Sequence, residues 1–166
     1  MIVIGIDPGK KGGVCVLSKT PGRTNDGKFC MHNEGEAVIM PCLKGLVDYF
    51  VHEHVMRHYS GGIAYVENVH AMPGQGVTSM FNFGKGFGEI LGVLAALNIR
   101  TELVSPQKWK RAVLAGTDRD KAAAIRFVQE NYPDIDLTPG RCRVPQDGIA
   151  DAVCIAHYGM LQEMKK

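Results

Sequence analysis

The chain has 166 residues, of which 45% are hydrophobic and 22% are charged, and its formal net charge is +2. This composition excludes a disordered polypeptide and the length excludes two large lobes, so we expect one domain over residues 1–166. No apolar run approaches the roughly 18 residues of a membrane span, and the five cysteines form no CxxC pair, so we expect a soluble cytoplasmic protein with free thiols.

The N-terminal third of the sequence predicts three β-strands in an antiparallel meander. Residues 2–7 form an apolar, β-branched run that ends at Asp7, where an Asp-Pro-Gly turn interrupts it. The runs GVCVLSK and EAVIMP predict the second and third strands, and we expect the polar stretch 20–33 between them to be a loop. Helical periodicity then takes over in residues 43–59, because the apolar side chains of this stretch fall on one face.

The remaining sequence alternates strands with helices. IAYVENVH predicts a short fourth strand with an acid, Glu67, at its end, and a long helix is expected at about 77–97. ELVSP predicts a fifth strand, and QKWKRAV and RDKAAAIRFVQENY predict two further helices. Pro145 precedes a final helix at about 146–164. We therefore expect an α/β fold in which a mixed five-stranded β-sheet is flanked by α-helices.

Four carboxylates are placed to meet at one edge of this sheet. Two strands each deliver an apolar run into a single acid, Asp7 and Glu67. Asp147 and Asp151 open the last helix about 40° from eclipsed, so both project from one face, which small and apolar neighbours would hold close to the sheet. Clustered carboxylates repel one another unless divalent cations neutralise them, and an oxygen-only ligand set favours Mg²⁺ or Mn²⁺. Two such ions about 4 Å apart can hold the attacking water and the leaving oxygen of a phosphodiester.

Each acid also has an explanation that needs no function. Asp7 in Asp-Pro-Gly is a common turn residue, Asp147 favours the positive end of a helix dipole, and Asp151 can pair with a neighbouring base. Glu67 is the hardest to explain in this way, because the sequence shows no local partner for it. The combination therefore carries more weight than any single member.

Four motifs resemble the RuvC-type Holliday-junction resolvases of the RNase H-like superfamily. They are IGIDPG at the N-terminus, YVENV at the fourth strand, FGKGFGEILGVL in the first long helix and DGIADAVCIA in the last. Their order and spacing cover nearly the whole chain. The resemblance implies an RNase H-like fold and a homodimer that cuts two strands of a four-way DNA junction. The long polar stretch 20–33 indicates a divergent member of the phage or organellar type.

The resemblance also implies which acids hold metal. By position, Asp7, Glu67 and Asp151 match that family's acids, which implies two Mg²⁺ ions in each active site, with Mn²⁺ as a substitute. The fourth acid departs from the pattern, because some bacterial members carry it three residues before the last Asp, where this chain has Gly148. Asp147 lies one residue earlier on the same helical face and is our candidate for the fourth ligand.

A basic stretch of the chain suits a polyanionic partner bound beside such a metal site. Residues 100–126 carry seven basic and three acidic side chains, a net charge of +4, whereas the remainder sums to −2. A solvated helix face explains this charge equally well. The loop after Glu67 offers side chains that can wedge into a junction, although a plain connecting loop explains it too. The candidate DNA contacts are His70, Met72, Lys85, Lys108, Lys110, Arg111 and Lys121.

Two residues of the basic stretch allow a second interpretation. Lys121 opens a predicted helix and can also neutralise transition-state charge near the metals. Trp109 lies between two lysines and can stack on a sugar or a base, but a lone tryptophan is more often a core residue.

Gly84, Gly88 and Gly92 recur every four residues along the first long helix. Each glycine costs a helix roughly 1 kcal/mol relative to alanine, so the stripe indicates close backbone approach, either to another helix of the chain, to a second subunit or to phosphates. The resemblance favours a dimer contact along this helix, with Phe81 and its neighbouring phenylalanines supplying apolar area. The stretch GKGFG lacks the spacing of a dinucleotide fingerprint, so we expect no nucleotide cofactor.

These features predict a metal-dependent, structure-selective endodeoxyribonuclease that resolves four-way junctions and leaves 5′-phosphate and 3′-hydroxyl ends. The alternative is a nuclease of the same chemistry that acts on other branched, single-stranded or RNA/DNA hybrid substrates, because only the glycine stripe and the loop after Glu67 separate the two. An actin-like kinase needs a duplicated domain and a far longer chain. A catalytically silent junction-binding protein would not need the intact set of acids.

Overall fold

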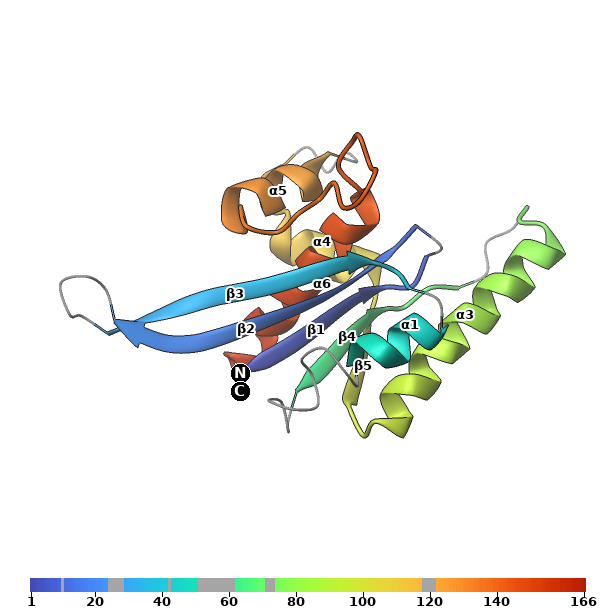
Figure 1. Ribbon diagram of the computed structural model, residues 1–166, viewed down its shortest axis with the longest axis horizontal. Coiled ribbons are helices and arrows are strands. Elements are labelled where there is room, and N and C mark those ends of the chain that lie inside the picture. Colours follow the sequence, from blue (N-terminus) through green and yellow to red (C-terminus); the bar gives the residue numbers. More distant parts are fainter. Residues whose placement is uncertain (10, 24–28, 42, 51–61, 71–73, 118–121) are drawn as a thin grey trace.

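A five-stranded sheet forms the centre of the computed structural model, which describes residues 1–9, 11–23, 29–41, 43–50, 62–70, 74–117 and 122–166. The strand order is β3-β2-β1-β4-β5 (Figure 1). The antiparallel meander consists of β1 (Ile2–Asp7), β2 (Gly13–Arg23) and β3 (Phe29–Ile39). The strands β4 (Ile63–Glu67) and β5 (Arg100–Val104) run parallel to β1. The mixed sheet expected from the sequence is thus confirmed.

The stretch 20–33, expected to be a loop, is largely a continuation of the β2–β3 hairpin. Backbone pairing runs from Gly13↔Ile39 to Arg23↔Phe29, whereas β1 accompanies β2 only as far as Ser18. Figure 1 shows the paired strands projecting beyond the rest of the sheet. The hydrogen bonds that pair two strands join backbone groups and do not depend on the side chains. A two-stranded ribbon of polar residues therefore shows no alternation of apolar and polar residues in its sequence. The expectation of a loop is therefore wrong for 20–23 and 29–33.

Helices cover both faces of the sheet (Figure 1). The strand β1 serves both layers, because Ile4 and Ile6 pack with the buried side chains of one helical layer while Val3 packs with those of the other. One face carries α1 (Leu43–Asp48) and α3 (Val77–Ala96), and the other carries α4 (Pro106–Val113), α5 (Ala123–Asn131) and α6 (Asp147–Glu163).

None of the described helices has the length and apolar character needed to span a lipid bilayer.

The helices predicted from the sequence are present where the structure describes them. The long helix expected at about 77–97 is α3, and the final helix expected at about 146–164 is α6. The helix predicted at 43–59 begins as α1, and the part of it after residue 50 lies outside the described residues.

The helix α6 lies directly on β1, because glycine and alanine leave little side chain between them. A Cβ atom at Gly5 would lie 2.2 Å from the carbonyl oxygen of Ala152 and 2.3 Å from the amide nitrogen of Ala156. Both alanines are fully buried. This close contact confirms that the small, apolar face of the last helix packs on the sheet, and it carries the acids at the start of α6 toward the end of β1.

Candidate active site

The four acids identified from the sequence lie at one edge of the sheet. Asp7 is the last residue of β1 and Glu67 is the last residue of β4, and these parallel strands pair as far as Ile6↔Val66. Asp147 begins α6, and Asp151 follows one turn later with a half-buried side chain. The pKa of Asp7 responds to the charges of Glu67 and Asp147, and the pKa of Asp151 responds to all three of the other acids. The four side chains therefore share one electrostatic environment.

Two of these acids hold their protons more strongly than ordinary aspartates. Burial raises the pKa of Asp7 to about 6, although a hydrogen bond from the Gly9 amide opposes this effect. Burial also raises the pKa of Asp151 to about 7, and the negative charges of the neighbouring acids add to the shift. At neutral pH the cluster thus carries negative charge that its surroundings neutralise poorly, which favours binding of a cation.

Lys110 of α4 lies within electrostatic range of the same acids. Its positive charge lowers the pKa of both Asp7 and Asp151, against the larger effect of burial. Its side chain is half-buried, and its Nζ lies 5.0 Å from the centroid of the Trp109 ring. Lys121, which the sequence suggested as a cation near the metals, lies outside the described residues.

Glu67 has a specific partner that the sequence did not reveal. The indole Nε1 of Trp109 donates a hydrogen bond of 2.9 Å to Oε1 of this carboxylate. Trp109 is fully buried in the core, so the idea that it stacks on a sugar or a base is wrong. Its ring packs in the protein interior, while its one polar atom reaches the acid cluster.

The start of α6 has no room for an acid at position 148. A Cβ atom at Gly148 would lie 1.9 Å from the carbonyl oxygen of Lys11, because the turn after β1 passes directly over this residue. No side chain, and hence no carboxylate, fits at this position with the backbone as it stands. Asp147 is exposed, and its Oδ1 accepts a hydrogen bond of 3.1 Å from the Gly148 amide. It is therefore the acid of the first turn that can contribute to the cluster.

The chemistry of the donors fits a hard divalent cation. All four candidates are carboxylates, and burial, together with the charges of the neighbouring acids, raises the pKa values of Asp7 and Asp151. Within the described part of the chain, no three acid, histidine or cysteine side chains stand close enough together to form a finished metal site. The cluster thus has the composition of a Mg²⁺ or Mn²⁺ site, and its side chains would need to rotate toward a shared ion.

A row of neighbouring pockets, here called the groove, begins beside the turn after Asp7, on the side of α3. Its first section, of about 480 Å³, is lined by Pro8 and Gly9, directly after Asp7, and by the inner side of α3. Ser79 and Phe83 of α3 also line the second section, of about 660 Å³. The two sections are therefore neighbours.

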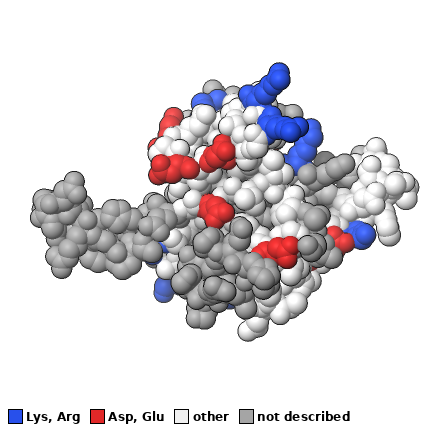
Figure 2. Space-filling model, in the orientation of Figure 1, with Lys and Arg blue, Asp and Glu red and all other residues white. Residues whose placement is uncertain are grey.

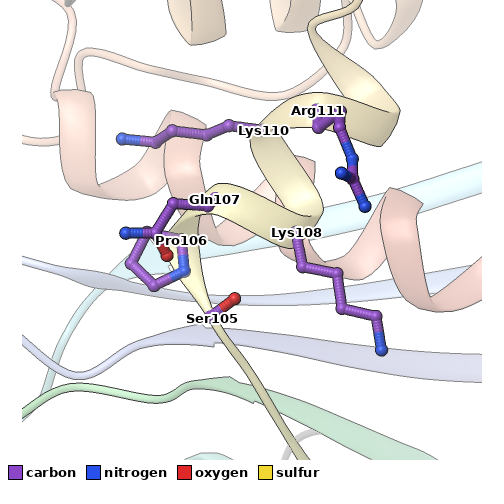
Figure 3. Close-up of a pocket in the computed structure, with 6 residues that line it drawn as sticks. All are labelled: Ser105, Pro106, Gln107, Lys108, Lys110 and Arg111. Carbon is purple, nitrogen blue, oxygen red and sulfur yellow. The ribbon is translucent and has the colours of Figure 1, made fainter.

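The groove continues from the end of β4 to the start of α4. His70, a candidate DNA contact, is exposed and lines the second section. Pro106 and Gln107 line both this section and a third one, of about 670 Å³. Figure 3 shows the third section, where Lys110 extends to one side of α4, and Lys108 and Arg111 extend to the other.

Positive charge accompanies the end of the sheet where the acids lie. Figure 2 shows Lys and Arg side chains gathered at the upper right of the molecule, on the side toward which β1 runs. Lys108 and Arg111 are exposed, as the proposed phosphate contacts require. Lys85 is also exposed, and its Nζ lies 3.7 Å from Glu89 of the same helix. Met72 lies outside the described residues.

The glycine stripe of α3 has no neighbour among the described residues. A Cβ atom at Gly84, Gly88 or Gly92 would meet no atom of that part of the chain within 4 Å. Tight packing against another of the described helices is therefore the wrong explanation for the stripe. On the same helix, Phe81 is 72% exposed and Val77 is 86% exposed. The dimer contact expected at Phe81, Gly84, Gly88 and Gly92 stays a prediction, and this face is open to receive a partner.

Comparison with known proteins identifies the fold. No family model and no curated protein sequence matches the chain. Thermus thermophilus RuvC aligns over 99% of this chain and 97% of its own, with a TM-score of 0.58 at 18% identity. The fold is that of RuvC. T. thermophilus RuvC in complex with a Holliday junction substrate also has a TM-score of 0.58, at 15% identity over 99% of this chain and 96% of its own.

A mitochondrial protein has the same RuvC-like architecture. The yeast mitochondrial Holliday junction resolvase aligns over 98% of this chain and 79% of its own, with a TM-score of 0.52 at 15% identity. The RNase H-like, five-stranded fold implied by the motifs is thus confirmed. Identities this low establish the fold alone, and the activity of the chain has to follow from its own residues.

Some residues of the site escaped the sequence analysis. Asn68, Ser79 and Gln107 line the groove and were not among the candidate contacts. Their common signal is position, because each lies within a few residues of the end of a strand or the start of a helix at this edge of the sheet. Polar residues directly after Glu67 and Ser105 could have been chosen on that basis.

Proposed function

We propose that this chain is a metal-dependent endonuclease that cuts branched DNA, with the four-way junction as its substrate. The observation that carries the proposal is the cluster of Asp7, Glu67, Asp147 and Asp151, which three separate segments bring to one edge of the sheet. Carboxylate clusters hold the divalent cations that assist phosphodiester hydrolysis. The fold supports the choice of substrate, because T. thermophilus RuvC shares it and was solved with a Holliday junction.

The acids and Lys110 have separate tasks in this mechanism. The four carboxylates would hold two Mg²⁺ or Mn²⁺ ions, which supply an activated water and stabilise charge at the scissile phosphate. Asp7 and Asp151 lose their protons before they act as ligands, so their raised pKa values disfavour metal binding in mildly acidic solution. Lys110 lies beside these acids and is suited to stabilise the negative charge that develops on the phosphate. Departure of the 3′-oxygen leaves 5′-phosphate and 3′-hydroxyl ends.

The groove supports a polynucleotide substrate. Each of its three sections shares lining residues with the next, from Pro8, beside Asp7, to Arg111. Exposed cations border the α4 end, where they can contact phosphates on either side of a scissile bond. An extended strand of DNA can lie along such a row of pockets.

A homodimer accounts for the cutting of two strands. One acid cluster makes one nick, so paired nicks require a second cluster in the same complex. The outer face of α3 combines the exposed side chains of Val77 and Phe81 with open glycines at 84, 88 and 92. Such a face buries apolar area and admits the backbone of a partner at short distance.

The test of the proposal is cleavage of a labelled synthetic four-way junction in Mg²⁺, beside a linear duplex, a single strand and an RNA/DNA hybrid of the same sequence. We expect the wild-type protein to cut the junction, and Asp7→Asn to lose about 100-fold or more of the rate. Asp134→Asn is the matched control, because it removes the same charge from an exposed loop position. Cleavage by Asp7→Asn at the wild-type rate would refute the mechanism. Faster cleavage of the hybrid or the single strand would refute the substrate and leave the chemistry intact.

A further inference from the structure

Trp109 is the only tryptophan of the chain, and it is fully buried. A buried indole N–H needs an acceptor, because an unpaired polar group in the interior is costly. Here the acceptor is Oε1 of Glu67, at 2.9 Å, and not a carbonyl group of the core. The carboxylate itself is half-buried and faces the acid cluster. A core side chain thus makes direct contact with one of the four acids.

The topology makes this contact rigid. The last pair of the β4–β5 ladder is Glu67↔Val104, and the amide of Asn68 donates a further hydrogen bond of 2.7 Å to the Val104 carbonyl. The helix α4 begins at Pro106, two residues after β5 ends, and Trp109 lies in its first turn. The amide of Trp109 donates to the Ser105 carbonyl at 3.3 Å. The paired strands β4 and β5 and the short connection from β5 to α4 therefore hold the indole beside Glu67.

Glutamate is the most flexible of the side chains in the cluster. It has one more rotatable bond than aspartate, and fixing such a side chain costs conformational entropy. A hydrogen bond to one carboxylate oxygen restricts the rotation and leaves the second oxygen available. Donors that contact a metal-binding side chain in this way orient it before the metal arrives. The bond is also stronger than one between neutral groups, because its acceptor carries a charge.

We propose that Trp109 is a positioning residue for Glu67, which it holds in the orientation required for cation binding. This inference rests on the proposed nuclease function. The next residue, Lys110, places its charge within range of Asp7 and Asp151 and its Nζ over the Trp109 ring. Two consecutive residues of α4 thus serve different acids, one through a hydrogen bond and the other through its charge.

The first test removes the N–H and keeps an aromatic ring. Trp109→Phe is expected to weaken the affinity for Mg²⁺, measured by calorimetry without DNA, by about 10-fold or more. Affinity for the junction without divalent cations is expected to stay unchanged. Tyr65→Phe is the matched control, since Tyr65 is also a buried aromatic donor, with a hydrogen bond of 2.8 Å to Glu163 at the opposite end of the sheet. It is expected to lower stability and to leave the affinity for Mg²⁺ as in the wild type. Equal Mg²⁺ affinities for Trp109→Phe and Tyr65→Phe overturn the positioning role.

The second test observes the hydrogen bond between Trp109 and Glu67 directly, and it needs no substitution in the core. Because the chain has one tryptophan, its NMR spectrum contains one indole N–H signal. Glu67→Gln replaces the charged acceptor with a neutral one, so this signal is expected to shift upfield. Glu130→Gln, an exposed change on α5, is expected to leave it in place. Addition of Mg²⁺ is expected to move the wild-type signal along a saturable curve.

The two failures are distinguishable. An indole signal that is the same in Glu67→Gln and in the wild type overturns the positioning role, whatever the cleavage assays give. A wild-type protein that neither binds Mg²⁺ nor cuts any nucleic acid overturns the proposed function, even if the indole signal responds to Glu67→Gln.

Discussion

Gly5 of β1 lies against the backbone of Ala152 in α6, at a separation that leaves no room for a side chain. A Cβ atom at Gly5 would lie 2.2 Å from the Ala152 carbonyl oxygen, and neither backbone can move without disturbing the strand or the helix. Asp7 follows two residues after Gly5, and Asp151 immediately precedes Ala152. The contact that sets the spacing of these elements thus also sets the position of two of the acids.

Gly5→Ala is expected to destabilise the protein by about 3 kcal/mol or more, because the added methyl group overlaps backbone atoms that cannot move aside as a side chain would. Urea denaturation measures this loss. Gly86→Ala makes the same change in the interior of α3, where a Cβ atom would meet no atom of the described residues within 4 Å. That control is expected to gain about 1 kcal/mol from helix propensity. Similar effects of the two substitutions would show that α6 does not lie on Gly5 as described.

Stability is expected to depend on pH through Asp7 and Asp151. Their folded-state pKa values, about 6 and about 7, exceed the unfolded value of 3.8, so the folded state binds more protons between these limits. The free energy of unfolding should therefore fall as pH rises from about 4 to about 7. Asp151→Asn removes its share of this loss and is expected to stabilise the protein at pH 8 by on the order of 1 to 3 kcal/mol, with no gain below pH 4.

Urea denaturation at several pH values without divalent cations measures this dependence. Asp134→Asn removes an exposed carboxylate of the same type and is expected to follow the wild-type curve. A gain for Asp151→Asn that is the same at pH 4 and pH 8 would contradict a raised pKa.

Lys110→Ala is expected to change the rate of cleavage and its pH dependence, whereas Lys108→Ala is expected to change the affinity for DNA. Lys110 lowers the pKa of Asp7 and Asp151, so its loss raises both pKa values further and moves the acidic limb of the activity profile to higher pH. Loss of its charge at the phosphate is expected to reduce the rate of cleavage by about 100-fold. Lys108 extends to the other side of α4, so its loss is expected to weaken junction binding and to reduce the salt slope by about 1.

Single-turnover cleavage across pH separates the two lysines from each other, and binding titrations across salt concentration provide the second readout. Each variant serves as the control for the other, since both remove one positive charge from α4. Identical pH profiles for the two variants would place Lys110 away from the acids.

Phe81→Asp is expected to convert a dimer into a monomer, because it places a charge in the centre of the exposed apolar face of α3. Sedimentation at micromolar concentration measures the change, and junction products should shift from paired nicks to single nicks. Val144→Asp is the control, as Val144 is also a largely exposed hydrophobic residue but lies in the loop before α6. A wild-type protein that sediments as a monomer would refute the dimer.

Local patterns in the sequence were sufficient for most of the elements and for the prediction that four acids lie at one edge of the sheet. The apolar run that ends at Asp7, the run that ends at Glu67 and the spacing of Asp147 and Asp151 are each visible within a few residues. Parallel neighbours in a sheet end at the same edge, so these signals also predicted a common location. The β2–β3 extension was missed because its strands are held by backbone pairing, and polar residues give no period-two signal there.

By itself, then, the sequence determined the core strands, the helices and which acids to propose, since each depends on residues close together in the chain. Only the tertiary structure decided which groups surround those acids. Trp109 follows Glu67 by 42 residues in the sequence. The two side chains meet because β5 pairs with β4, and α4, which follows β5, therefore begins beside the end of β4. Gly148 is excluded as a ligand position by Lys11, from a turn at the other end of the chain. Such contacts depend on distances between remote segments, and local patterns of polarity do not encode those distances.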